Sequence, residues 1–160
     1  IAAYPEDLEA SIEILKKNGV TSAHLSAGGD MRLLGDKMGK PWIIGIKNPR
    51  DESQQSIVLP LSDTAVSTSG DYERFFMDEK GERVHHILSP KTGKPVKGIM
   101  SVTILADDAI TSDGLSTAVF VLGVKEGLAL VNRLNGIDAI LIDEFGKVHY
   151  SEGLIRPVTN

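Results

Sequence analysis

The sequence contains no cysteine among its 160 residues, and aromatic residues make up only 5% of it. Disulfide bonds, thiolate catalysis and sulfur-ligated metal sites are therefore excluded. No apolar run approaches the roughly 18 residues that a membrane-crossing helix needs, so we expect no membrane span. The formal net charge is −5 and Lys and Arg form no dense cluster, which argues against nucleic acid as the main partner. A small phosphorylated ligand is compatible with this composition, because it needs only local positive charge or a metal.

What is present is the composition of an ordinary globular protein, with 41% hydrophobic residues. The length suits one domain, so we expect residues 1–160 to form a single domain. The sequence begins at Ile1 instead of Met, and no signal peptide or lipid anchor is visible. We therefore interpret it as a fragment or a processed form of a longer protein.

The hydrophobic pattern predicts an α+β fold. Pro5 and Gly19 bound an amphipathic helix at the start, and two further helices are expected at about 108–122 and 125–134. We expect the first of these two helices to pack through Ile110, Val119, Val121 and Leu122. The order is not strict βαβ alternation, which favours a mixed, mostly antiparallel sheet with packed helices over a doubly wound sheet. The expected strands are Thr21–Ser26, Trp42–Ile46, Ser56–Leu61, Thr64–Ser67, Tyr72–Met77, Arg83–Leu88, Ile99–Leu105, Ile137–Ile142 and Lys147–Tyr150.

The most informative segment, Ser101–Gly123, runs from a strand into a helix. Asp113 and Thr117 are four residues apart, so their oxygen atoms share one helix face. A carboxylate beside a hydroxyl suits a hard cation such as Mg²⁺, which prefers oxygen ligands and often binds substrate phosphates as well. The alternative is a solvated Asp and a Thr bonded to its own backbone. The spacing alone favours this alternative, because Asp-x-x-x-Thr is common.

Two histidines begin the second segment, His85–Val96, at the end of an expected strand and before turns at Pro90 and Gly93. A His that faces the backbone N–H groups of a turn suits an acid–base role or a phosphate contact. The alternative is a surface His beside an ordinary turn. The other two histidines, His24 and His149, show no metal-ligand spacing to each other.

Two shorter segments are compatible either with ligand contact or with plain turns. Ser26–Asp30 ends a strand with two glycines and an acid, and the glycines permit a ligand to approach closely. It is not a dinucleotide fingerprint, because the Gly-x-Gly-x-x-Gly spacing and the following helix are absent. In Thr68–Phe76, Ser69 lacks the Gly-x-Ser-x-Gly frame of a hydrolase nucleophile. A turn that leads into an aromatic strand is the simpler interpretation of that segment.

Together and in this order, the segments resemble the ApbE family of flavin transferases from about Val20 to Tyr150. The family has a Gly-Gly-Asp after a strand, a Thr-Ser-Gly-Asp-Tyr-Glu-Arg-Phe-Phe-like run, a His-Ile-x-x-Pro-x-Thr-Gly-x-Pro run and an Asp-Ala-Leu-Ser-Thr-Ala run. The last two runs are quite specific. The counterparts here are Gly28–Asp30, Thr68–Phe76, His86–Pro95 and Asp113–Ala118, with Gly114 in place of the usual Ala.

The family uses Mg²⁺ to transfer FMN from FAD onto a Ser/Thr hydroxyl of an acceptor protein. The resemblance therefore implies an ApbE-like domain with FAD as substrate and a protein that bears a Ser/Thr hydroxyl as partner. Carried over by position, Asp113 and Thr117 help to hold Mg²⁺, His86 is the catalytic group near the flavin and phosphates, and Asp30 and Ile87 belong to the cofactor pocket. A periplasmic or cell-envelope location is implied through the family alone.

One family segment has no full counterpart here. An Asp-Leu-Gly-x-Ile-Ala-Lys-Gly-Tyr-like segment precedes the first helix in the family and supplies a main-chain metal ligand and a Lys near the flavin. Only Ile1 and Ala2, followed by Ala3 and Tyr4, stand at its place. We therefore expect this chain to lack the N-terminal part of its domain and, by itself, to show no appreciable transferase activity and weak or absent FAD binding. We also expect it to expose apolar surface or to cover that surface in a homodimer. The alternatives are a non-catalytic flavin- or FAD-binding protein and an inactive fragment on the same scaffold.

Overall fold

The computed structural model describes residues 4–155, apart from the side chain of Glu52. Ile1 and Ala2, which were compared with the family's upstream segment, lie outside the described residues. The helices are α1 (Pro5–Lys17), α2 (Ala109–Val131) and α3 (Glu152–Ile155). The strands are β1 (Ala23–Ala27), β2 (Asp30–Leu34), β3 (Trp42–Asn48), β4 (Asp51–Leu61), β5 (Ala65–Gly70), β6 (Phe75–Met77), β7 (Arg83–His85), β8 (Ile99–Ala106), β9 (Asp138–Asp143) and β10 (Val148–Tyr150).

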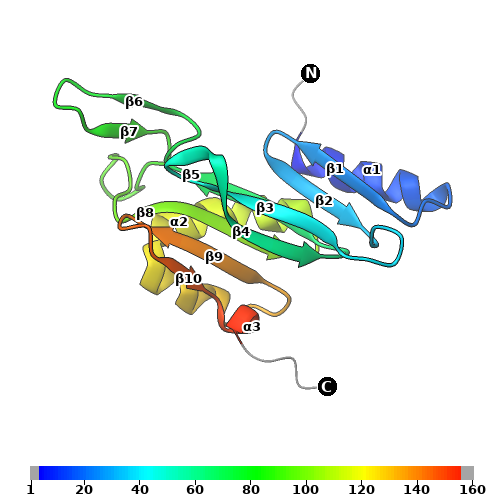
Figure 1. Ribbon diagram of the computed structural model, residues 1–160. Coiled ribbons are helices and arrows are strands. Elements are labelled where there is room, and N and C mark those ends of the chain that lie inside the picture. The colour runs from blue at the N-terminus through cyan, green and yellow to red at the C-terminus, as the bar shows by residue number, and fades with distance from the viewer. Residues whose placement is uncertain (1–3, 156–160) are drawn as a thin grey trace.

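A six-stranded sheet in the order β1-β2-β5-β8-β9-β10 forms the body of the molecule (Figure 1). Every neighbouring pair in it is antiparallel, which confirms the predicted α+β class. The hairpins β3–β4 and β6–β7 form separate two-stranded sheets. Figure 1 shows β6–β7 extending beyond the main sheet, while α2 runs along β8 and β9.

The sheet is incomplete along one part of β5. β2 pairs with only the first two residues of β5, Ala65 and Val66, whereas β8 pairs with β5 along its whole length. From Ser67 to Gly70, within the part of the chain that is described, β5 therefore has no strand partner on its second side. Such an edge presents backbone N–H and C=O groups that a ligand can use.

The hydrophobic core lies between α2 and the central strands. All of β8 is buried, and Phe120 of α2 is fully buried among residues of β8 and β9. Val119 is also buried and Val121 is partly buried against the core, as predicted. The prediction was wrong for Ile110 and Leu122, which are 55% and 45% exposed. The face that packs inwards carries small residues as well as large ones: Ala109, Ser112, Ser116, Val119, Phe120, Gly127 and Val131.

α2 contains the break that separates the two predicted helices. Gly123 has φ 76° and ψ −177°, so the helix is sharply kinked there. Asp108 begins the helix, and its carboxylate accepts a hydrogen bond of 2.7 Å from the backbone N–H of Thr111. By length and composition alone, α2 is also apolar enough to cross a membrane, although core helices share this property. The absence of a membrane span stays a prediction.

The other differences concern strands. β2 was not predicted, and it returns from β1 through Gly28 and Gly29, with φ 64° and 111°. Such a two-residue hairpin turn favours glycine, because both residues need positive φ. β4 is longer than predicted and β6–β7 is shorter. The segment Tyr72–Arg74 is a turn instead of a strand, and this turn borders the candidate site.

Candidate functional site

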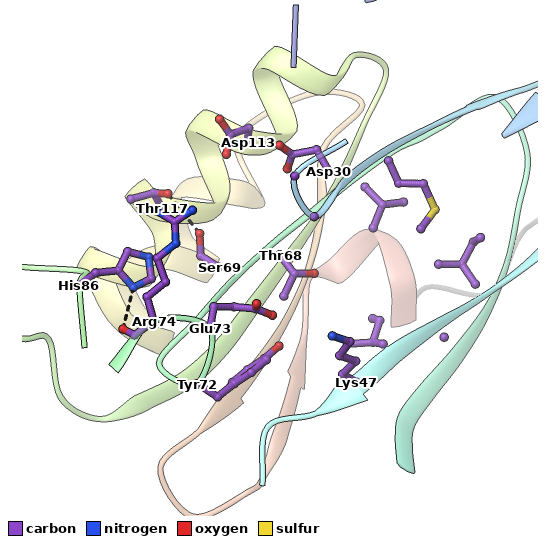
Figure 2. A pocket seen from close by; sticks show the side chains of 18 residues that line it. Asp30, Lys47, Thr68, Ser69, Tyr72, Glu73, Arg74, His86, Asp113 and Thr117 are labelled. Atoms are coloured by element: carbon purple, nitrogen blue, oxygen red, sulfur yellow. Dashed lines mark hydrogen bonds between the residues drawn. The ribbon is translucent and has the colours of Figure 1, made fainter. Parts of the chain in front are cut away.

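A cleft of about 530 Å³ runs along the free edge of β5 (Figure 2). This volume lies within the roughly 300–1,000 Å³ that small-molecule sites occupy. The cleft is bordered by the turn between β1 and β2, by β3, by the turn after β5, and by one face of α2. Of the residues proposed from the sequence, Asp30, His86, Asp113 and Thr117 line it together.

The side of the cleft formed by α2 is organised by hydroxyl groups. Ser69 of β5 has its Oγ 2.8 Å from Ser116 Oγ and 3.1 Å from Thr117 Oγ1. One turn earlier, Ser67 Oγ and Ser112 Oγ are 2.7 Å apart. These contacts fasten α2 to β5 and place Thr117 at the rim of the cleft. We call Asp113, Thr117 and Ser69 the α2 wall.

Two carboxylates meet at one end of the α2 wall. Figure 2 shows Asp30, which follows the glycine turn, beside Asp113 of α2. Burial raises the pKa of Asp30, a side-chain hydrogen bond with Ser67 opposes this shift, and the negative charge of Asp113 raises the pKa further. The two carboxylates are thus close enough for the charge of Asp113 to act on Asp30. A cation bound between them would relieve the repulsion.

His86 stands at the opposite end of the α2 wall. Its Nδ1 lies 3.2 Å from the carbonyl oxygen of Arg74, and its backbone N–H donates to the same oxygen. A carbonyl oxygen can only accept, so this contact requires a proton on Nδ1. In the neutral ring with this tautomer, Nε2 carries the lone pair. The ring is exposed, so a substrate can reach it.

The two residues next to His86 in the sequence, His85 and Ile87, are buried. His85 is buried, its Nε2 is 2.8 Å from the carbonyl oxygen of Val96, and its ring meets Phe120 edge-on. Ile87 is buried in the hydrophobic core and does not line the cleft. The Ile87 side chain therefore faces the core instead of the cleft, in the bend that follows β7. A contact between Ile87 and a cofactor stays a prediction.

Several cleft residues were not proposed from the sequence. Figure 2 shows Arg74 extending past His86 towards Thr117, and Lys47 of β3 facing the cleft from the other side, near Tyr72. Glu73 also lines the cleft. The Thr68–Phe76 run contained the signal for Arg74 and Glu73. No local pattern singled out Lys47, which reaches the cleft only through the position of β3.

The donor set fits Mg²⁺ better than a transition metal. Within residues 4–155 no cluster of three or more His, Cys, Asp and Glu side chains could hold a metal ion. Two neighbouring carboxylates, Asp30 and Asp113, together with the hydroxyl of Thr117, supply oxygen donors alone. Mg²⁺ usually binds through one or two carboxylates and keeps its other positions for water and substrate phosphates. These residues are therefore compatible with such an ion.

Comparison with known proteins identifies the family and the fold of the chain. The model of the ApbE family matches residues 8–141. Curated proteins named FAD:protein FMN transferase from Treponema pallidum and Vibrio cholerae are 36% and 35% identical to the chain, over 92% and 91% of its length. The crystal structure of the ApbE protein from Thermotoga maritima superposes with a TM-score of 0.84 at 40% identity and covers 94% of the chain. The apo form of the flavinyl transferase ApbE from Pseudomonas stutzeri has a TM-score of 0.78 at 35% identity.

These relatives are longer than the chain. The matched region is 43% of the Treponema protein, 44% of the Vibrio protein and 49% of the Thermotoga structure. The chain thus spans less than half the length of each of these proteins.

Proposed function

The chain belongs to the ApbE family, and from this premise we propose that it carries part of the site at which FMN is transferred from FAD to a Ser/Thr hydroxyl of an acceptor protein. The observation that carries the proposal is the convergence of Asp30, His86, Asp113 and Thr117 in one cleft. These residues come from three separate segments of the sequence, and phosphoryl-type transfer needs such groups at one place.

The acidic end of the cleft is the proposed metal site. Asp113 and Thr117 would hold Mg²⁺, with Asp30 close enough to contribute charge. When bound, Mg²⁺ supplies neutralisation of phosphate charge. Burial and the negative charge of Asp113 raise the pKa of Asp30, and a cation bound at this end of the cleft would offset both effects.

The basic groups of the cleft are suited to bind the pyrophosphate of FAD. Arg74 lies beside His86 and Thr117, where its guanidinium can donate in pairs to phosphate oxygens. Lys47 provides a second positive charge on the opposite side. The free edge of β5 provides backbone hydrogen-bond donors. The side chains of Ile44 and Ile46 provide an apolar surface for a ring.

The proposed reaction is a displacement at the phosphorus of the FMN half of FAD. The acceptor hydroxyl oxygen forms the new P–O bond, the P–O bond to the AMP half breaks, and AMP departs with that oxygen and the electron pair. Nε2 of His86 takes the proton of the acceptor hydroxyl. The Nδ1 contact with the Arg74 carbonyl orients the ring for this role.

The proposal is tested with the full-length protein, FAD, Mg²⁺ and an acceptor protein with a Ser/Thr site. We expect a covalent flavin on the acceptor, seen as fluorescence that survives denaturing electrophoresis, and release of one AMP per flavin attached. Replacement of the acceptor hydroxyl by Ala is the matched control and should abolish labelling. FAD binding without labelling or AMP release would contradict the proposal and favour a non-catalytic flavin-binding protein.

A further inference from the structure

The side of the cleft opposite α2 is formed by the hairpin β3–β4, which is a two-stranded sheet of its own. Residues Ile44–Lys47 of β3 line the cleft, and we call them the β3 wall. Among the described residues, β3 and β4 pair with each other and with no other strand. A two-stranded hairpin alone is marginally stable in water. The position of the β3 wall therefore depends on the burial of Ile44 and Ile46 and on the polar side-chain contacts that join the hairpin to the body.

Two such contacts lie at opposite ends of the hairpin. Near its base, Trp42 Nε1 donates to the carbonyl oxygen of Gly35 over 3.2 Å. At its tip, the guanidinium of Arg50 donates through Nη1 and Nη2 to Oδ1 and Oδ2 of Asp71, each over 2.7 Å. Asp71 is itself fixed to β8, because its backbone N–H donates to the carbonyl oxygen of Met100 over 3.0 Å. The Arg50–Asp71 pair thus joins the hairpin tip to the central sheet.

The geometry of this pair makes it a stronger contact than an ordinary surface ion pair. The Asp71 side chain is 10% exposed, whereas that of Arg50 is 44% exposed. Two parallel hydrogen bonds between a guanidinium and a carboxylate add directional specificity that a single ammonium contact lacks. Loss of Arg50 would leave the Asp71 carboxylate largely buried without its cation, which is unfavourable.

The pair also lies next to the residues that face the cleft. The register between β3 and β4 shifts between Ile46 and Lys47 and again between Lys47 and Asn48. Such bulges bend a strand and redirect side chains. Lys47 therefore stands between an irregular stretch of β3 and the Arg50 turn. On the other side of the pair, Asp71 leads directly into the turn that carries the cleft residues Glu73 and Arg74.

We propose that Arg50 and Asp71 are positioning residues that hold the β3 wall, and Lys47 with it, at a fixed distance from the turn that carries Arg74. Neither residue lines the cleft, so they act through the elements that they join. The pair thereby sets the width of the cleft and its affinity for FAD. The identity of the ligand rests on the proposed function, whereas the fastening of the hairpin does not.

The first measurement needs no ligand. Hydrogen exchange of the full-length protein is compared for the wild type, Arg50→Ala, Arg50→Lys and the double variant Arg50→Ala/Asp71→Asn. In Arg50→Ala we expect the amides of β3 and β4 to exchange about tenfold faster while those of α2 and β8 are unchanged. Arg50→Lys should lie between wild type and Arg50→Ala. Lys16→Ala, which breaks an exposed ion pair with Glu13 on α1, is the control and should leave the hairpin unaffected.

The second measurement follows FAD. We expect Arg50→Ala to raise KM for FAD about tenfold while kcat at saturating FAD stays within about twofold, because the groups that react are on the other wall. Arg50→Lys should recover part of the affinity. The double variant should retain the defect, since it removes the unpaired charge without restoring the link between the hairpin and the body.

The two measurements separate the inference from the proposed function. Faster exchange confined to the hairpin, in a protein whose wild type does not bind FAD, would support the fastening and contradict the proposed function. Unchanged exchange in β3 and β4, or an equal increase in every segment, would overturn the fastening. A loosened hairpin with an unchanged KM would overturn the link to affinity. If Arg50→Ala does not fold, Arg50→Lys is judged by the same criteria.

Discussion

The two walls of the cleft differ in how they are built. The α2 wall belongs to the main body: α2 packs on β5 and β8, and paired hydroxyls join Ser69 to Ser116 and Thr117. The β3 wall belongs to a separate hairpin that is fastened at its base by Trp42 and at its tip by Arg50. Both walls contain buried residues, since Ile44 and Ile46 are buried as well, but only the α2 wall is built on the main sheet and its helix.

This difference matches the demands of the proposed reaction. Groups that take part in bond making need placement to within a fraction of an ångström, and a site built on packed helices and strands provides it. A wall that only has to fit the ligand can be held more loosely. The comparison predicts that substitutions in or beneath the α2 wall lower the stability of the fold or the rate of transfer. Substitutions on the β3–β4 hairpin should instead lower the affinity for FAD.

The largest effect is expected from removing the support of the α2 wall. Phe120 is fully buried beneath it, so Phe120→Ala should lower the free energy of unfolding by about 3–5 kcal/mol through lost burial and a cavity. Urea unfolding of the two proteins measures the difference. Ile43→Ala, at an exposed position on β3, is the comparison and should cost less than about 0.5 kcal/mol. Equal losses for the two variants would contradict the structural role of the buried Phe120 side chain beneath the α2 wall.

The next effect concerns the carboxylate on the α2 wall. Asp113→Ala should reduce FMN transfer by at least about 100-fold in the full-length protein, because it removes the charged member of the proposed metal site. The fold should persist, since Asp113 lies on the helix surface facing the cleft. Acceptor fluorescence is followed over a range of Mg²⁺ concentrations, with Glu126→Ala, an exposed carboxylate of the same helix away from the cleft, as control. Undiminished labelling at low Mg²⁺ would refute the role of Asp113.

A smaller effect is expected one turn further along the helix. Thr117→Val should lower transfer at low Mg²⁺ by about tenfold, because a neutral hydroxyl contributes less charge and water can replace it. Added Mg²⁺ should restore most of the activity of this variant. The same titration that is used for Asp113→Ala measures it. A defect that high Mg²⁺ leaves unchanged would place Thr117 outside the metal site.

The smallest effect is a pH dependence of stability at Asp30. The pKa of Asp30 in the folded protein is raised, mainly by burial, so the charged carboxylate destabilises the fold. Stability is therefore lost as the pH rises from the pKa of the unfolded chain through the higher pKa of the folded protein. Asp30→Asn should stabilise the metal-free protein at pH 7 by less than about 1 kcal/mol, since water screens a half-exposed group. Near pH 3 the Asp30 side chain is protonated and neutral like that of Asn, so the difference in stability between wild type and Asp30→Asn should vanish. Urea unfolding at the two pH values, without Mg²⁺, measures the difference. A less stable Asp30→Asn variant at pH 7 would contradict the prediction.

The two adjacent histidines show where prediction from sequence stops. His85 and His86 have the same chemistry and nearly the same local context. The structure buries His85 against Phe120 and exposes His86 at the cleft. His85 is buried because its side of the chain packs against α2. Since α2 is distant in the sequence, the local sequence does not indicate which of the two histidines faces it. Here only the resemblance to a family singled out His86.

The buried face of α2 is a second example. Hydrophobic periodicity predicts that large apolar residues face the sheet, yet Ser112 and Ser116 are buried there and Ile110 and Leu122 are exposed. The serines are accommodated because their hydroxyls meet Ser67 and Ser69 of β5. A hydrophobic pattern does not contain such pairing, because the partners are more than forty residues apart in the sequence.

The sequence by itself determined the features that depend on near neighbours along the chain. These are the α+β class, the two-glycine turn before Asp30, the helix that places Asp113 and Thr117 on one face, and the break in α2 at Gly123. Local backbone preferences and side-chain spacing suffice for each of them.

Only the tertiary structure decided how the cleft is enclosed. The free edge of β5 arises because β2 pairs with just two of its residues, and Lys47 faces the cleft because a separate hairpin crosses there. The pair that fastens this hairpin joins Arg50 to Asp71, 21 positions further along the chain. Such contacts depend on the path of the folded backbone through space, and local preferences carry no information about that path.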